Sequence, residues 1–126
     1  MKFLFLIHHD EGELDAMPEK EMEALVDSAL DYVEEIKRSG HFIASNALQR
    51  AQTGRIVRVR GGKVTMTDGP FAETKEKLGG FFLIEAKDLD EACRLAARFP
   101  PARIATLEVR AVQELVHSTR TGVALR

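Results

Sequence analysis

The stretch Asp68-Gly69-Pro70-Phe71-Ala72-Glu73-Thr74-Lys75-Glu76 lies between two segments that both have strand patterns. Before it, residues 55–60 (Arg-Ile-Val-Arg-Val-Arg) and 63–67 (Lys-Val-Thr-Met-Thr) alternate between apolar and polar types around Gly61-Gly62. A two-residue glycine link between alternating segments predicts a β-hairpin. After it, residues 79–86 (Gly-Gly-Phe-Phe-Leu-Ile-Glu-Ala) have the short apolar run of a buried strand. The nine residues are therefore a constrained connection between two sheet elements.

The hairpin register follows from the pattern. Pairing Arg60 with Lys63 sets two apolar pairs opposite each other, Val59 with Val64 and Val57 with Met66. All four side chains then share one face, because strand side chains alternate with a period of two. The polar side chains, including Arg58 and Arg60, share the other face.

The remaining pattern predicts two helices and three more strands. Residues 2–8, 41–48 and 104–112 have strand patterns, and residues 10–17 are an acidic stretch expected to be a loop. An amphipathic helix begins at Pro18 and ends at Gly40, and a second begins after Asp88 and ends before Pro100. The predicted fold class is α+β: a ferredoxin-like β-α-β-β-α-β sheet with an inserted β-hairpin.

Two helices cover only one face of such a sheet. Residues 3–7 and 81–84 are apolar on both faces, so the uncovered face needs a partner. We expect a homodimer packed face to face, and the alternative is that the hairpin folds over this face.

Bulk composition narrows the class of protein. The chain has 126 residues, a net charge of −2 and one cysteine, Cys93, which we expect to pack as a small apolar residue. The charge argues against a nucleic-acid-binding protein, and no apolar run approaches the length of a membrane helix. Without a signal peptide or a possible intrachain disulfide, we expect a cytoplasmic protein, with one domain over residues 1–112 and a tail over 113–126.

Residues 68–76 resemble the signature of the DGPF branch of the YCII-related domain family. The resemblance extends over about residues 1–112 and is carried further by residues 1–7, 57–60, 77–84 and 88–92. It implies a bacterial protein with a dimeric ferredoxin-like fold of the dimeric α+β barrel type, in a family whose activity is generally uncharacterised. Many members are encoded beside extracytoplasmic-function sigma factors, which suggests a shared pathway.

The resemblance does not supply a catalytic pair. In the wider family, a His early in the first helix and an Asp before a Pro after the second have been proposed as acid and base. Here the first helix begins at Pro18 without a His, and Phe99 precedes Pro100. This departure weakens the enzyme interpretation or moves the chemistry elsewhere.

The motif has a structural and a functional interpretation. Asp68, Gly69 and Pro70 suit a rigid turn in which Gly69 adopts unusual backbone angles, and Phe71 is expected to anchor the loop on apolar surface. On the functional interpretation, a polar cluster at a pocket mouth binds ligand, and Arg58 and Arg60 of the hairpin bind an anionic ligand or an acidic partner. The cluster consists of Glu73, Thr74, Lys75 and Glu76.

The candidate catalytic residue is a histidine at the end of the first strand. His8 ends a buried strand and is a candidate acid–base residue together with Asp68, Glu73 or Lys75. His8 and His9 are expected on opposite faces of the strand, so we predict no metal site there. No phosphate loop or other cofactor motif is present, and no cofactor is expected. Two hypotheses follow: a small-molecule-binding or regulatory dimer, or a small enzyme with a His/carboxylate site near the motif.

Overall fold

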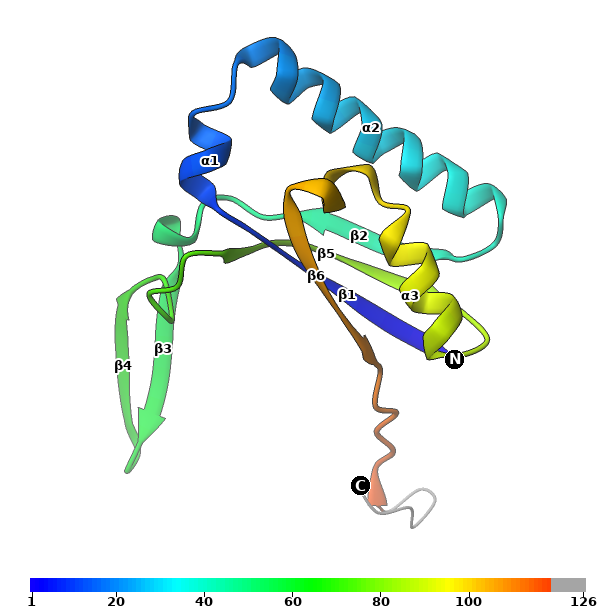
Figure 1. Cartoon of the computed structure of the whole chain (residues 1–126). Coiled ribbons are helices and arrows are strands. Elements are labelled where there is room, and N and C mark those ends of the chain that lie inside the picture. Colours follow the sequence, from blue (N-terminus) through cyan, green and yellow to red (C-terminus); the bar gives the residue numbers. More distant parts are fainter. Residues whose placement is uncertain (119–126) are drawn as a thin grey trace.

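The computed structural model describes residues 1–118, so the end of the predicted tail, residues 119–126, lies outside the described residues. The elements follow the predicted order with three short additions, helix α1 after the first strand and the 3-10 helices η1 and η2 (Figure 1). They are β1 (Lys2–His9), α1 (Glu11–Asp15), α2 (Glu19–Arg38), β2 (Phe42–Ala47), η1 (Ala51–Thr53), β3 (Arg55–Arg60), β4 (Lys63–Asp68), β5 (Lys77–Glu85), α3 (Leu89–Ala97), η2 (Pro100–Arg103) and β6 (Ala105–Ala111).

Four strands form one antiparallel sheet in the order β2-β5-β1-β6, which is the ferredoxin-like arrangement. Helices α2 and α3 lie on the same face of this sheet (Figure 1). The core between the layers contains Phe3, Phe5 and Ile84, which are almost fully buried, and an aromatic group around Tyr32. The predicted α+β fold class is confirmed.

The opposite face of the sheet is not covered by any element within residues 1–118. Its centre is apolar because Leu6 lies opposite Phe81, and Leu4 lies opposite Leu83, in the β1–β5 ladder. All four side chains are only half-buried. We call this surface the open face.

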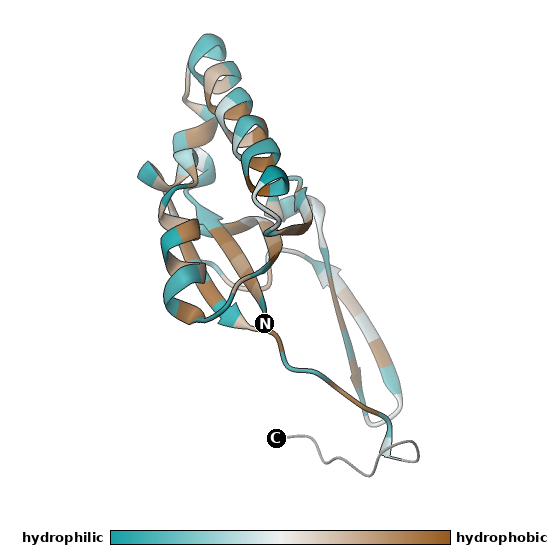
Figure 2. Cartoon of the chain, turned by 90° about the vertical axis from the view of Figure 1, so that its right-hand side faces the viewer, coloured by the Kyte–Doolittle hydropathy of each residue, from teal (hydrophilic) through white to brown (hydrophobic). Residues whose placement is uncertain are grey.

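The β3–β4 hairpin has the predicted register, with Arg60 opposite Lys63 and Val57 opposite Met66. Gly61 and Gly62 have φ angles of 57° and 76°, the left-handed region that a tight two-residue turn requires. The hairpin projects away from the four-stranded sheet, and apolar segments run along both of its strands (Figures 1 and 2). It therefore does not fold over the open face, and this alternative was wrong.

Two further expectations were wrong. Residues 11–15 form helix α1 instead of a loop, because Asp10 caps its first turn: the carboxylate accepts from the N–H groups of Gly12 and Glu13 at 3.0 and 3.3 Å. Cys93 is exposed, because the buried side of α3 is formed by its neighbours Ala92, Leu95 and Ala96. No helix within residues 1–118 combines the length and the apolar character needed to cross a membrane.

Candidate functional site

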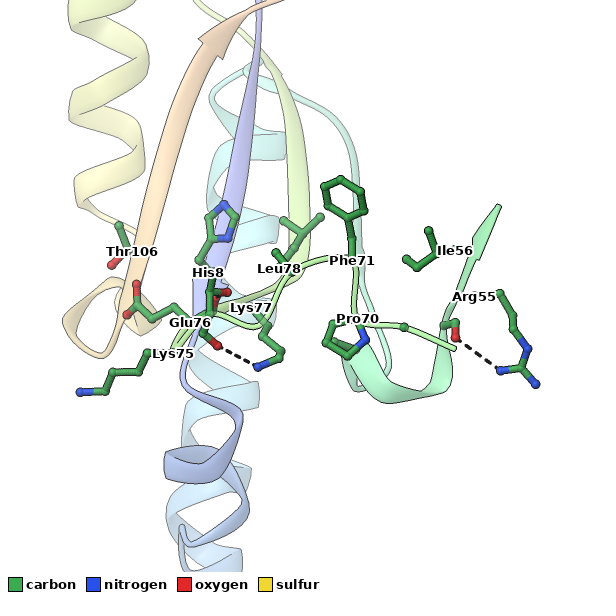
Figure 3. Close-up of a pocket in the computed structure, with 15 residues that line it drawn as sticks. His8, Arg55, Ile56, Pro70, Phe71, Lys75, Glu76, Lys77, Leu78 and Thr106 are labelled. Atoms are coloured by element: carbon green, nitrogen blue, oxygen red, sulfur yellow. Dashed lines mark hydrogen bonds between the residues drawn. The ribbon is translucent and has the colours of Figure 1, made fainter. Parts of the chain in front are cut away.

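A hollow of about 830 Å³ lies between the motif loop, the base of the hairpin and one end of the open face. We call it the motif pocket. Its apolar wall comes from Ile56 of β3, from Pro70 and Phe71 of the motif, and from Leu78 of β5. His8 of β1 and Thr106 of β6, which pair with each other in the ladder, line the side nearest the sheet (Figure 3).

The motif loop is held in place by contacts with the segment around η1. The Gly69 N–H donates to the Gly54 carbonyl at 2.9 Å. A Cβ on Gly69 would lie 2.9 Å from the Ala51 oxygen, so no side chain fits at this position. The positive-φ glycines in the described chain are Gly40, Gly61 and Gly62, so Gly69 does not use the left-handed region, although the peptide bond that joins it to Pro70 is cis. Gly69 is needed for space.

Helix α1 fixes the η1 segment from the other side. The Glu11 carboxylate accepts from the Ala51 N–H at 2.9 Å, and Arg50 forms an ion pair with Asp15 at 2.8 Å. The acidic stretch of the sequence thereby positions the backbone against which Gly69 packs. The motif loop is supported by a chain of contacts that begins at α1.

Phe71 does not anchor the loop in the way the sequence suggested. Its side chain is 76% exposed, and its ring and the His8 ring project to the same side of the loop in Figure 3. The Arg58 guanidinium lies 5.7 Å from the centre of the ring, a cation–π distance. A phenylalanine exposed to this degree leaves most of its ring as an apolar contact surface.

The polar part of the motif divides into groups inside and outside the pocket. Thr74, Lys75 and Glu76 line it, whereas Glu73 does not. The Thr74 hydroxyl donates to the Glu76 carbonyl at 2.5 Å, and the Lys77 ammonium donates to the Thr74 carbonyl at 2.8 Å. Within residues 1–118, no hydrogen bond or ion pair holds the Lys75 ammonium. The Lys75 ammonium therefore has all of its donors available to a ligand.

The other predicted site residues lie further out. Asp68 is 80% exposed and forms an ion pair with Arg55 at 3.0 Å, so its carboxylate closes the base of the hairpin and does not line the pocket. Arg60 donates to the carbonyl of its neighbour Val59 near the hairpin tip. His8 thus shares the pocket with Thr74, Lys75 and Glu76, and not with Asp68 or Glu73.

His9 is a residue that the sequence interpretation passed over. It lies on the helix-facing side of β1, and its ring packs directly on Gly79 of β5. Burial, assisted by the nearby Arg50 guanidinium, lowers the pKa of His9 below its ordinary value of 6.5, against the opposing influence of Glu11 and Glu76. The signal in the sequence was Gly79-Gly80, a pair of residues without side chains at the start of a strand. Within residues 1–118, no group of three or more His, Cys, Asp or Glu side chains is arranged to hold a metal ion.

Comparison with known proteins gives a family and a fold. The model of the YCII-related domain family matches residues 1–116. An uncharacterised protein of Rhizobium meliloti is 31% identical over 96 residues, which cover 76% of this chain and 77% of that protein. Among solved structures, the chain resembles a 5-chloro-2-hydroxyhydroquinone dehydrochlorinase from Burkholderia phenoliruptrix in complex with 2,5-dihydroxybenzoquinone. The TM-score is 0.51 and the identity 18%, over 90% of this chain and 94% of that one.

Proposed function

The chain belongs to the YCII-related domain family, and from this premise we propose that it is a cytoplasmic homodimer that binds a small molecule in the motif pocket. One observation carries the proposal: the motif, held rigidly through Gly69, forms the wall of a hollow that is also lined by His8 and Lys75. The volume of about 830 Å³ lies within the range of small-molecule sites, roughly 300–1,000 Å³.

The open face supports the homodimer. Leu4, Leu6, Phe81 and Leu83 form an apolar centre that a second copy of the same face would bury. His8 and Thr106 belong to this face and also line the motif pocket. A copy packed here would border the pocket and reduce its exposure to solvent.

The lining favours a planar organic anion. Phe71, Pro70 and Leu78 offer an apolar wall, and Lys75 offers a positive charge without a partner among residues 1–118. The fold neighbour holds 2,5-dihydroxybenzoquinone, a flat ring with acidic hydroxyl groups. The same chemical class suits an apolar wall with cationic side chains at its edge.

The test is calorimetric titration of the purified full chain with 2,5-dihydroxybenzoquinone. We expect saturable binding with one ligand per chain. The Lys75→Gln variant should bind about tenfold more weakly or worse, because a hydrogen bond to a charged group is lost. Lys87→Gln, which removes a lysine just beyond the far end of β5, is the matched control and should bind as wild type does. Equal weakening by both variants would mean that only overall charge matters, and binding unaffected by Lys75→Gln would remove the pocket from the proposal.

A second candidate function is acid–base catalysis in the same pocket. It is favoured by two observations. His8 and Glu76 both line the motif pocket, and the solved structure with a similar fold is an enzyme. If the pocket is catalytic on that class of molecule, the chain should release chloride from 5-chloro-2-hydroxyhydroquinone, and His8→Gln should abolish the release. Binding without chloride release would favour the binding protein.

A regulatory role beside an extracytoplasmic-function sigma factor stays a prediction from the family resemblance. The exposed β3–β4 hairpin, with Arg58 and Arg60 on one face, is the surface we expect such a partner to contact. Pull-down with the wild-type chain and with an Arg58→Glu, Arg60→Glu double variant tests it. Capture of the sigma factor by both forms would exclude the hairpin.

A further inference from the structure

A second hollow, of about 520 Å³, lies between helix α2 and strands β2 and β5, on the face of the sheet opposite the motif pocket. It exists because the side chains that face each other across the layers are small. Ala29 of the helix faces Ser45 and Ala47 of β2 and the Gly79-Gly80 pair of β5. Larger helix residues stand at the rim, where Leu30 is 60% exposed. The hollow is large enough for a small organic molecule.

His9 is the titratable group at the β1 end of this hollow. A Cβ on Gly79 would lie 2.0 Å from the His9 Cε1 atom and 2.2 Å from Nε2, so the ring occupies the space that a side chain on Gly79 would need. No group within residues 1–118 forms a hydrogen bond with either ring nitrogen. The Ser45 hydroxyl, which also lines the hollow, has no hydrogen-bond partner in this part of the chain either.

The surroundings of His9 favour the neutral form of its imidazole. Burial and the Arg50 guanidinium lower its pKa, while Glu11 and Glu76 act in the opposite direction and His8 adds a further lowering. Arg50 is already paired with Asp15. A neutral imidazole donates one hydrogen bond and accepts another, which matches the two roles of a hydroxyl group.

At the other end of the hollow, the Lys37 ammonium already has partners within the chain. It forms an ion pair with Glu34 at 3.5 Å and lies 5.3 Å from the centre of the Phe42 ring. The rest of the lining is mainly aliphatic and aromatic. The lining therefore favours an uncharged, apolar molecule over an anion.

We propose that this hollow, the His9 pocket, is a second ligand site that takes a mainly apolar molecule with one hydroxyl group, such as a phenol, and that the hydroxyl forms a hydrogen bond with the His9 imidazole. It differs from the motif pocket in the face of the sheet that it uses and in its preference for an uncharged ligand. The adjacent residues His8 and His9 serve the two pockets separately, because strand side chains alternate between faces.

The probe is 2-naphthol, with naphthalene as the matched compound without a hydroxyl, titrated into the full chain at neutral pH. We expect the wild type to bind 2-naphthol about tenfold more tightly than naphthalene, and His9→Phe to remove this difference while still binding naphthalene. His8→Phe, on the opposite face of the same strand, should leave the preference for 2-naphthol intact.

A second measurement uses only the wild-type chain, so the test does not depend on whether a variant folds. Nuclear Overhauser effects in the wild type should connect the naphthol protons with the Ala29 methyl group. The proposal is overturned if 2-naphthol does not bind, if it binds no better than naphthalene, or if the Overhauser contacts lead elsewhere. It is overturned equally if folded His8→Phe, rather than His9→Phe, loses the preference, because the probe would then lie in the motif pocket.

Discussion

Leu6 is the residue at which the proposed dimer is most vulnerable. It lies at the centre of the open face, opposite Phe81 on one side and Glu108 of β6 on the other. Leu6→Glu would place a carboxylate in the apolar centre and directly beside an existing carboxylate. We predict that this variant is monomeric at concentrations at which the wild type is dimeric.

The magnitude follows from the burial of Leu6. Complete burial of a leucine stabilises by about 1.5–3 kcal/mol, and Leu6 is already half-buried in one chain, so dimerisation adds about 1 kcal/mol per copy. A two-fold dimer loses this amount twice, and the cost of burying two new carboxylates brings the loss to about 3 kcal/mol. Such a loss weakens association by a factor of about 100 or more.

Sedimentation velocity over a range of concentrations is the assay. The wild type should sediment with twice the chain mass of 14.1 kDa, and Leu6→Glu with that mass itself, while circular dichroism verifies that the variant is folded. Leu89→Glu is the control, because Leu89 is an exposed leucine at the start of α3, in the helical layer. A monomeric wild type, or a folded Leu6→Glu variant with unchanged association, would refute the role of the open face.

Three further predictions concern single groups. Tyr32→Phe removes the hydroxyl that donates to the Leu95 carbonyl at 2.5 Å and should lower the free energy of unfolding in urea by about 0.5–1.5 kcal/mol; an unchanged value would contradict a stabilising bond. Gly69→Ala places a methyl group 2.9 Å from the Ala51 oxygen and should cost about 1–3 kcal/mol in the same assay, whereas wild-type stability would mean that the loop yields easily. Burial lowers the pKa of His9 below 6.5, so the unfolded chain takes up a proton that the folded chain resists, and stability falls as the pH falls below that value. His9→Gln should flatten this decline between about pH 7.5 and 5.5, and parallel curves for variant and wild type would contradict it.

The hairpin and the sheet were predictable because their signals are local. Gly61-Gly62 between alternating segments determines both the turn and the register, and Arg60 opposite Lys63 followed directly. The end of helix α2 at Arg38 was likewise marked by a local signal, because Gly40, two residues beyond it, has a φ of 81°. The continuous apolar runs at residues 3–7 and 81–84 were sufficient to predict that the sheet has two apolar faces.

The site was less predictable because its parts meet only in three dimensions. That Asp68 lies opposite Arg55 follows from the hairpin register, but that it lies outside the pocket lined by His8 depends on the relative position of the hairpin and the sheet, which no local pattern gives. The position of His9 depends on Gly79, seventy residues away in the sequence, coming to lie under its ring. Cys93 was misplaced for a simpler reason: a helix turn of mainly small residues, Ala92, Cys93 and Ala96, leaves its buried side weakly defined.

The contact between Gly69 and the Ala51 carbonyl has a consequence for how the motif is used to classify proteins. The glycine of the motif is required because the Ala51 carbonyl leaves no room for a side chain at position 69. The aspartate of the motif forms an ion pair with Arg55 at the base of the hairpin. Neither requirement depends on what the pocket holds. A search keyed to Asp-Gly-Pro-Phe therefore gathers chains that share a way of building this loop, and chains so gathered are free to differ in their ligands.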